Sequence, residues 1–488
     1  MNRKKELVKN TLIISIGKFS TKLVQFLLLP LYTSILTTAQ YGEYDLLNII
    51  SIFLIPIITL QMDEGMFRFL IEAKTDNDKR DVFSHTIIFT VISSVLWSLI
   101  IFVVGSLLNY QYTLWLIVYC LASVVYSITS GFSRGEGNFK LYSVLAFLNS
   151  LFNILLNILF LAVFKLGLPG LFLAYTISST LVGLFGLFKL HAHKYLSFRV
   201  KNRKLLREMI KYSFPLVPNN VSWSIISLSD RLLIVHFIDK DANGIYAAGN
   251  KFPTIINTCF GFFNTSWRES ASRAVEDAEA RDKFYKEIYI TLKHFLMGIS
   301  ISLIALLPFI FSILVNKAYN EAYLYIPIMI ISIYYANMSS FSSGIFSAYK
   351  DNNILAPTTV IAAIINIVFD ILLIGKIGLW APVIGTFMAY FIINTYRNYK
   401  LRKYVVLPKD PYTGLNIVVL LAICCSYYLG KVNIFSVPNY IAVGLQVLAL
   451  ILGLGYSYYI NRSFVKAIFN KKLFARFKKR LGGNKDGQ

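Results

Sequence analysis

Charged residues are scarce in this sequence. Only 15% of its 488 residues are Asp, Glu, Lys or Arg, whereas 56% are hydrophobic, and the mean hydropathy is +0.59. Such a composition lies outside the range of soluble globular domains and indicates an integral membrane protein. The net charge of +23 would suggest nucleic-acid binding in a soluble chain. Here the basic residues cluster in short segments between apolar runs, so we expect no nucleic-acid partner.

Signatures of catalysis are also missing. The sequence has no Walker motif, zinc signature or nucleophile elbow, and its five histidines are scattered. The four cysteines lie within apolar runs and have no metal-ligand spacing. We therefore predict no enzymatic activity, no metal and no cofactor, and leave coupling to a proton or sodium gradient open.

Long apolar runs dominate what is present. Runs of about 20 residues are the length that crosses a bilayer as a helix. They predict an all-α polytopic membrane protein with about fourteen transmembrane helices, near residues 10–35, 44–66, 83–108, 112–132, 141–164, 169–189, 212–237, 243–266, 288–315, 322–347, 354–375, 380–396, 413–430 and 438–460.

The basic residues predict the topology of these helices. Of the 48 Lys and Arg, 39 lie in the tails and in the alternate loops on the side of the termini, and 5 lie in the loops on the other side. Positive residues are retained in the cytoplasm, so both termini are expected to be cytoplasmic.

The first apolar run carries a polar stripe. Polar residues in it are spaced by three and four positions, so they share one helix face: Thr11, Ser15, Lys18, Lys22 and Gln25. A charge at the centre of a membrane helix costs roughly 2.5–3.5 kcal/mol, so this stripe must face a wet or anionic region.

A related pattern recurs 202 residues later, in the run that begins near residue 212. Gly42, Tyr44 and Asn48 also recur at this offset, as Gly244, Tyr246 and Asn250. We predict two six-helix parallel repeats, forming N- and C-lobes around a central cavity, plus two extra C-terminal helices. The predicted parts are an N-lobe (1–190), a basic cytoplasmic linker (191–211), a C-lobe (212–404), helices thirteen and fourteen (405–461) and a basic cytoplasmic tail (462–488).

Four cations lie inside the predicted helices: Lys18, Lys22, Arg231 and Lys251. Because lipid would penalise each of them, they predict a cationic cavity between the halves whose natural ligand is a phosphate or diphosphate. The structural alternative is that each cation is paired internally.

Amides and hydroxyls on the predicted helices are candidates for hydrogen bonds to sugar hydroxyls. They are also the groups that join neighbouring membrane helices, and both interpretations stay open. The candidate substrate-binding residues are thus Lys18, Lys22, Gln25, Arg231, Lys251, Asn220, Ser224, Asn153 and Asn366.

Intramembrane acids are fewer. They could serve as gate residues, as coupling-ion sites or as simple charge partners, and Asp230 cannot share the helix face of the adjacent Arg231. With a nearby arginine, the gate or ion-coupling candidates are Asp63, Glu64, Arg68, Asp230 and Asp370.

These features together resemble a known family. The lysine-bearing first helix, the tract Tyr41-Gly42-Glu43-Tyr44, Ser229-Asp230-Arg231 and Gly244-x-Tyr246 are similar to polysaccharide-transport, Wzx-type flippases of the multidrug/oligosaccharidyl-lipid/polysaccharide exporter superfamily. The resemblance implies a V-shaped, alternating-access fold in a bacterial plasma (inner) membrane. It also implies that the protein moves undecaprenyl-diphosphate-linked oligosaccharide repeat units to the outer leaflet for cell-surface polysaccharides such as capsule and exopolysaccharide.

The resemblance implies partners and leaves rivals. The partners would be the lipid-diphosphate-linked glycan and membrane lipids, with a polysaccharide polymerase and glycosyltransferases as further candidates. The alternatives are a lipid II flippase of peptidoglycan synthesis, a multidrug cation extruder, for which twelve helices and an acidic cavity would be expected, and a non-transporting membrane scaffold for glycan-synthesis enzymes.

Overall fold

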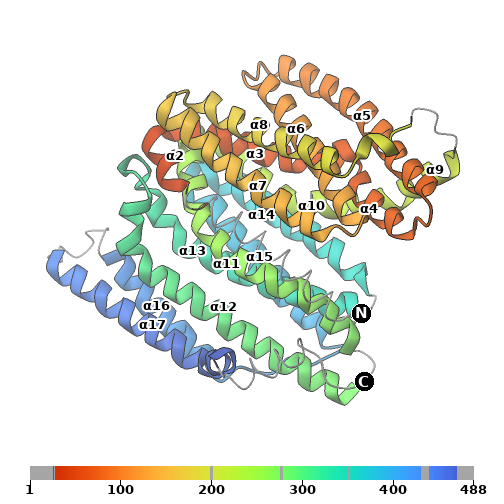
Figure 1. The fold of residues 1–488 in the computed structure, drawn as a ribbon. Helices are drawn as coiled ribbons and strands as arrows, with labels where there is room; N and C mark the ends of the chain where they lie inside the picture. The colour runs from red at the N-terminus through yellow and green to blue at the C-terminus, as the bar shows by residue number, and fades with distance from the viewer. Residues whose placement is uncertain are drawn as a thin grey trace. The chain divides into compact units, whose positions relative to one another are not determined.

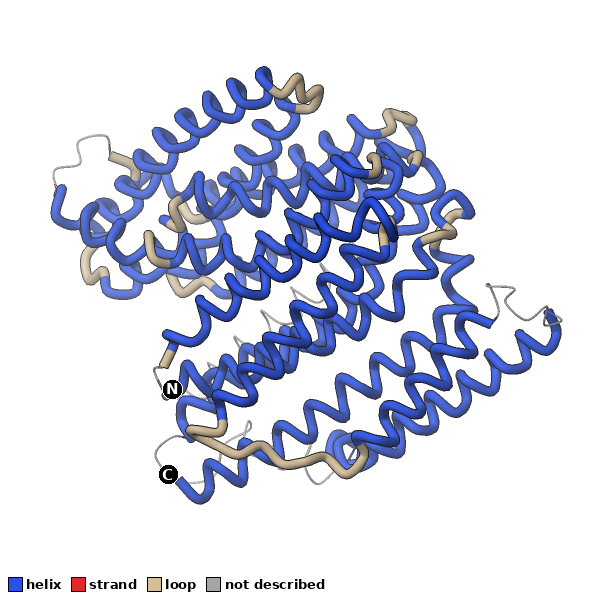
Figure 2. The backbone as a smooth tube through the Cα atoms, turned by 180° about the vertical axis from the view of Figure 1, so that it is seen from behind, coloured by secondary structure: helices blue, strands red, loops and turns tan. Residues whose placement is uncertain are grey.

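The computed structural model describes residues 26, 28–197, 202–274, 278–349, 351–429 and 439–469, and these residues form helices with no strand among them (Figures 1 and 2). The α-helices are α2 (Leu29–Ile35), α3 (Thr38–Thr59), α4 (Met62–Glu72), α5 (Asp76–Leu107), α6 (Thr113–Gly135), α7 (Phe139–Asn157), α8 (Leu168–Lys189), α9 (Arg203–Ser213), α10 (Leu216–Phe237), α11 (Lys240–Arg273), α12 (Ala278–Leu314), α13 (Ala322–Ala348), α14 (Leu355–Ile377), α15 (Trp380–Leu401), α16 (Thr413–Leu429) and α17 (Asn439–Phe469).

The predicted class is confirmed, because the described chain is all-helical and nine of its helices are long and apolar enough to cross a membrane. Every apolar run predicted from residue 44 onward falls on one or two of these helices. Of the first run, the structure describes little more than its end, α2. The stripe from Thr11 to Gln25 lies outside the described residues, and so does most of the basic tail.

One predicted helix is divided in two. The run 44–66 forms α3 and α4, separated by Leu60 and Gln61, which both have left-handed backbones with φ of 48° and 55°. Pro56 inside α3 removes one backbone donor, and Ser93 donates a 2.6 Å hydrogen bond to the Ile58 carbonyl near the end of α3. The run from residue 212 likewise begins at the end of α9, and Pro215 separates α9 from α10.

The chain packs as two compact units. The first comprises Glu6–Ala247 and Asp370–Gly378, and the second Ala248–Phe369 and Leu379–Gln488. These units group residues that pack together, whereas the predicted lobes were bounded by the sequence repeat. The lobe boundaries therefore stay a prediction.

In the first unit, α6 packs closely against α8 through small residues. Gly183 lies against Val125 and Gly186 against Thr129, whose hydroxyl donates a 3.0 Å hydrogen bond to the Gly183 carbonyl. Such residues let membrane helices approach closely. By contrast, the middle of α5 exposes apolar side chains such as Val91, Ile92 and Leu99, as expected of a helix that faces lipid.

In the second unit, α13 is the most buried of the apolar spans and packs along α15. Trp267 of α11 stacks on Phe341 of α13, with ring centroids 4.3 Å apart, and donates a 3.0 Å hydrogen bond to its carbonyl. The C-terminal helices α16 and α17 lie along α12 (Figure 1).

Candidate functional site

A cavity of about 530 Å³ lies in the first unit, at the break between α3 and α4. Its volume falls in the usual range of ligand sites, about 300–1,000 Å³. It brings together two predicted substrate-binding residues, Asn220 and Ser224, and two predicted gate residues, Asp63 and Glu64. The described lining residues are Ile52, Pro56, Gln61, Asp63, Glu64, Tyr212, Leu216, Asn220 and Ser224.

The left-handed break places polar groups on the wall of this cavity. Gln61 follows the last turn of α3, and its side-chain carbonyl accepts a 2.9 Å hydrogen bond from Asn220 of α10. Asp63 and Glu64 occupy the first turn of α4, where the helix dipole favours negative charge. Tyr212 reaches the cavity from the end of α9, and its ring meets Phe69 edge-on at 6.2 Å.

A second group of charges is buried beside α3 and α10. The Arg231 guanidinium donates to Asp45 over 3.1 Å, and both side chains are less than a tenth exposed. Arg231 also lies over the Tyr246 ring, 5.0 Å from its centroid. The structure thus places Arg231 in an ion pair with a residue that we had not singled out.

Two buried carboxyl groups lie next to that ion pair. Tyr246 donates a 2.6 Å hydrogen bond to Asp230, so Asp230 contacts a neighbouring helix, as the angle between adjacent residues on a helix predicts. Asp370 of α14 interacts with Asp230, and neither Asp370 oxygen has a hydrogen-bond partner among the described residues. Two facing carboxyl groups attract each other only when a proton or a cation lies between them.

The starts of α3 and α11 cross at two glycines. A side chain on Gly42 would overlap the carbonyl of Lys240, and a side chain on Gly244 would overlap the carbonyl of Thr38. Asn243 holds the crossing together with a 2.7 Å hydrogen bond to the Gly42 carbonyl.

Polar contacts surround the glycine crossing. Lys240 forms an ion pair with Glu43 over 2.6 Å, and Thr38 donates a hydrogen bond to Asp241.

The remaining predicted site residues lie elsewhere. Asn153 donates to Ser178 between α7 and α8, and Arg68 forms an exposed ion pair with Glu72. Asn366 is buried and donates to Thr386 in the second unit, where Lys251 is half-buried on α11.

Three predicted substrate ligands lie outside the described residues: Lys18, Lys22 and Gln25. None of these placements tests substrate binding, which stays a prediction for every residue named.

The second unit holds an arginine that the sequence did not reveal. Arg397 of α15 is fully buried, and all five of its N–H groups donate to neutral oxygens. These belong to α13 and α14 and lie 2.8–3.2 Å away: the hydroxyls of Ser339, Ser343, Thr358 and Thr359 and the Leu355 carbonyl. Arg397 thus joins α13, α14 and α15, and its acceptors among the described residues are hydroxyl and carbonyl oxygens rather than carboxylates.

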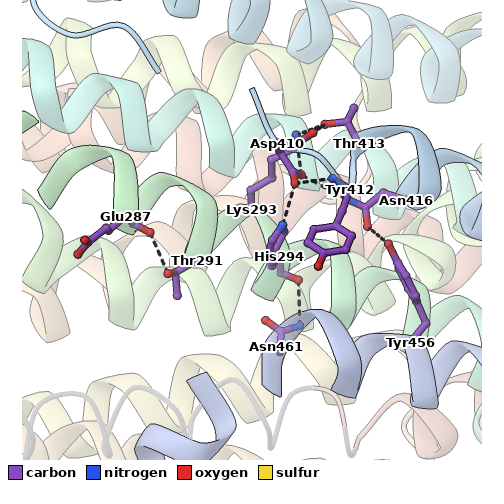
Figure 3. Close-up of polar contacts among 10 residues, drawn as sticks. All are labelled: Glu287, Thr291, Lys293, His294, Asp410, Tyr412, Thr413, Asn416, Tyr456 and Asn461. Atoms are coloured by element: carbon purple, nitrogen blue, oxygen red, sulfur yellow. Dashed lines mark hydrogen bonds and ion pairs between the residues drawn. The ribbon is translucent and has the colours of Figure 1, made fainter. Parts of the chain in front are cut away.

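A polar cluster fastens α16 and α17 to α12 (Figure 3). Lys293 and His294 of α12 both contact Asp410, each over 3.0 Å. Burial by itself would raise the pKa of Asp410. Hydrogen bonds from His294, the Tyr412 amide and Lys293 outweigh burial and hold the pKa below its ordinary value. Asn461 of α17 completes the cluster by donating to the His294 carbonyl over 3.1 Å.

Comparison with models of known protein families shows to which family the chain is related. Residues 7–267 match the family model described as "Polysaccharide biosynthesis protein", and this match spans more than half of the sequence. The chain belongs to this family. The resemblance drawn from the sequence motifs is thereby confirmed.

Solved structures share the fold. The chain is similar to "Lipid II flippase MurJ, inward closed conformation", with 14% identity, a TM-score of 0.68, and coverage of 94% of this chain and 100% of that one. It is also similar to the inward-facing conformation of a multidrug resistance MATE family transporter of the MOP superfamily, with 15% identity, a TM-score of 0.64, and coverage of 80% and 97%. No curated protein sequence matches the chain.

Proposed function

We propose that this family member is a flippase that moves lipid-diphosphate-linked oligosaccharide repeat units from the inner to the outer leaflet of a bacterial plasma membrane, by alternating access. The observation that carries the proposal is the polar cavity at the α3–α4 break, which is lined by α3, α4, α9 and α10, and of these α3 is long and apolar enough to cross a membrane. A glycan cannot cross hydrocarbon without hydrogen-bonding partners, and such a cavity removes part of that cost. No bond is broken, so the protein is proposed to be a transporter and not an enzyme.

Alternating access requires closure on one side of the cavity. We assign this closure to the crossing of Gly42 and Gly244, which the predicted topology places at the outer side of the membrane. The cavity wall at Asp63 and Glu64 lies at the inner end of the same predicted span. A glycan would therefore enter from the cytoplasm.

Ion coupling is assigned to Asp230 and Asp370. Binding or release of a proton or sodium ion at these carboxyl groups would change the charge next to the Arg231–Asp45 pair, which joins α10 to α3. A gradient of that ion could then drive the transport cycle.

Leaflet translocation tests the proposal. The protein is reconstituted in vesicles with a fluorescent lipid-diphosphate oligosaccharide, and the fraction accessible to a membrane-impermeant quencher is followed. Translocation that requires the protein is the expected result. A lipid II analogue in parallel vesicles tests the rival substrate, and translocation of neither lipid would favour the scaffold alternative.

A further inference from the structure

The cavity at the α3–α4 break has an acidic wall. Asp63 and Glu64 contribute carboxylates, and no Lys or Arg is among the described lining residues. A diphosphate would be repelled by this wall. This part of the cavity therefore suits a different portion of a lipid-linked glycan.

Asp63 keeps an unused acceptor. Ser127 of α6 donates a 2.5 Å hydrogen bond to Oδ2. The other oxygen, Oδ1, is buried and has no hydrogen-bond partner within the described part of the chain. An ionised carboxylate accepts about four hydrogen bonds, so a donor on a ligand would satisfy an atom that the protein leaves unsatisfied.

Glu64 differs from its neighbour, because its charge is balanced. Arg134 of α6 donates to it over 2.7 Å, and the same guanidinium lies over the Phe67 ring, 4.7 Å from its centroid. The net negative charge at this wall therefore comes from Asp63.

The other lining groups complete a mixed surface. Asn220 and Ser224 add an amide and a hydroxyl from α10, and Tyr212 adds an aromatic side chain with a polar tip. A sugar ring presents hydroxyl donors at its edge and apolar C–H groups on its faces. Together these groups match such a ring, and the charge on Asp63 opposes one that carries a carboxylate.

We propose that this cavity is the subsite for a non-acidic sugar residue of the glycan. A hydroxyl or amino group of that sugar donates to Asp63, and a uronic acid at the same position is rejected. The inference rests on the proposed flippase function and adds a substrate class to it.

The test compares two lipid-diphosphate oligosaccharides that differ in one residue, a neutral hexose in one and the corresponding hexuronic acid in the other. Wild type is expected to translocate the neutral lipid about tenfold faster, which corresponds to roughly 1.4 kcal/mol of charge repulsion. Asp63→Asn is expected to bring the two rates within about threefold, mainly by accelerating the acidic lipid. Asp76→Asn, at an exposed aspartate that starts α5, is the matched control and should keep the wild-type ratio.

A second variant distinguishes a change in substrate preference from a general loss of transport. Asn220→Ala should slow both lipids by a similar factor and leave their ratio unchanged, because the amide carries no charge. Equal wild-type rates for the two lipids, or a ratio that Asp63→Asn does not alter, would overturn the subsite while leaving the flippase function standing. Wild type that translocates neither lipid would overturn the function itself. Binding of a fluorescent organic cation that Asp63→Asn abolishes, with an unaltered glycan ratio, would assign the acidic wall to cations instead.

Discussion

Gly42 and Gly244, which occupy the same position in the two sequence repeats, lie against each other's helix starts. Each faces a backbone carbonyl of the other segment, and those carbonyls belong to Thr38 and Lys240, which are also separated by the repeat offset of 202 residues. The contact is therefore reciprocal. It gives the internal repeat a physical counterpart at one point in the fold.

Gly244→Ala should weaken this crossing. The added methyl group overlaps the Thr38 carbonyl, so the helix starts must separate, at a cost of about 1–3 kcal/mol. Thermal unfolding in detergent should show a lower Tm, and a cysteine introduced nearby should become more accessible to a thiol reagent added on the side that the topology prediction makes the outer one. Gly375→Ala in α14 is the control, because nothing lies within 4 Å of its added methyl group. Equal Tm changes in the two variants would argue against a close crossing.

Arg231→Ala should be strongly destabilising, whatever its effect on transport. Removing one partner of a buried ion pair leaves Asp45 uncompensated, at a cost of about 3–5 kcal/mol. The double variant Asp45→Leu/Arg231→Met removes both charges and should recover most of the stability, as measured by Tm. Translocation by this stable double variant then shows whether Arg231 is needed for more than folding. A double variant as unstable as the single one would contradict the pairing.

Asp370→Asn should uncouple transport from its driving ion. The amide keeps the shape of the side chain but cannot release a proton, and it holds a cation less well than a carboxylate. Vesicles with an imposed proton or sodium gradient should show accelerated translocation for wild type and no acceleration for the variant. Asp351→Asn, near the start of α14, is the control. A variant that still responds to both gradients would place coupling elsewhere.

Asp410→Asn should loosen the attachment of α16 and α17. Losing the charge leaves Lys293 and His294 without their acidic partner, and we expect a destabilisation of about 1–3 kcal/mol at pH 7. The folded-state pKa of Asp410 lies below its unfolded value. Its stabilisation is therefore present above that unfolded value, about pH 4, and disappears as the pH falls through the folded pKa.

Unfolding temperatures across this pH range check the Asp410 prediction. The difference between wild type and Asp410→Asn should be full at neutral pH and shrink below about pH 4. A difference that grows on acidification would contradict the lowered pKa.

Arg397→Lys should destabilise the protein although lysine keeps the positive charge. Lysine has three donors on a flexible stem and cannot reproduce the planar fork that reaches five oxygens on α13 and α14. We expect a loss of about 3 kcal/mol in stability, measured as a lower Tm. Arg402→Lys, at an exposed position one turn later, should change the Tm little. Similar values for the two variants would argue that the buried hydrogen bonds contribute little.

The membrane-spanning helices could be predicted from the sequence because each one depends on the length of a single local apolar run. Apolar length fixed the approximate bounds of α5, α6, α8 and the helices of the second unit, and the matches extend to α16 and α17. The break at Leu60 and Gln61 could not be predicted in this way. Left-handed backbone usually carries Gly or Asn, and here only Pro56, one turn earlier, hinted at an irregular helix.

The candidate site was predictable in part. Asp63, Glu64, Asn220 and Ser224 were singled out because polar groups are costly inside a membrane, and the cavity brings them together. Their partners depend on tertiary packing. Asp45 was overlooked within a polar tract at a helix start. Nothing in the sequence distinguished Arg397 from the surrounding basic residues of a loop predicted to be cytoplasmic.

Both ends of α16 are held to other helices of the second unit. Tyr323 and Tyr427 stack with ring centroids 3.9 Å apart, and each hydroxyl donates to the other residue's carbonyl. With the Asp410 cluster at the opposite end, α16 has two anchors on the second unit, so it cannot swing independently of α12 and α13. A spectroscopic label on the exposed Tyr440 of α17, which packs on both α16 and α12, would therefore report the displacement of the whole unit during turnover.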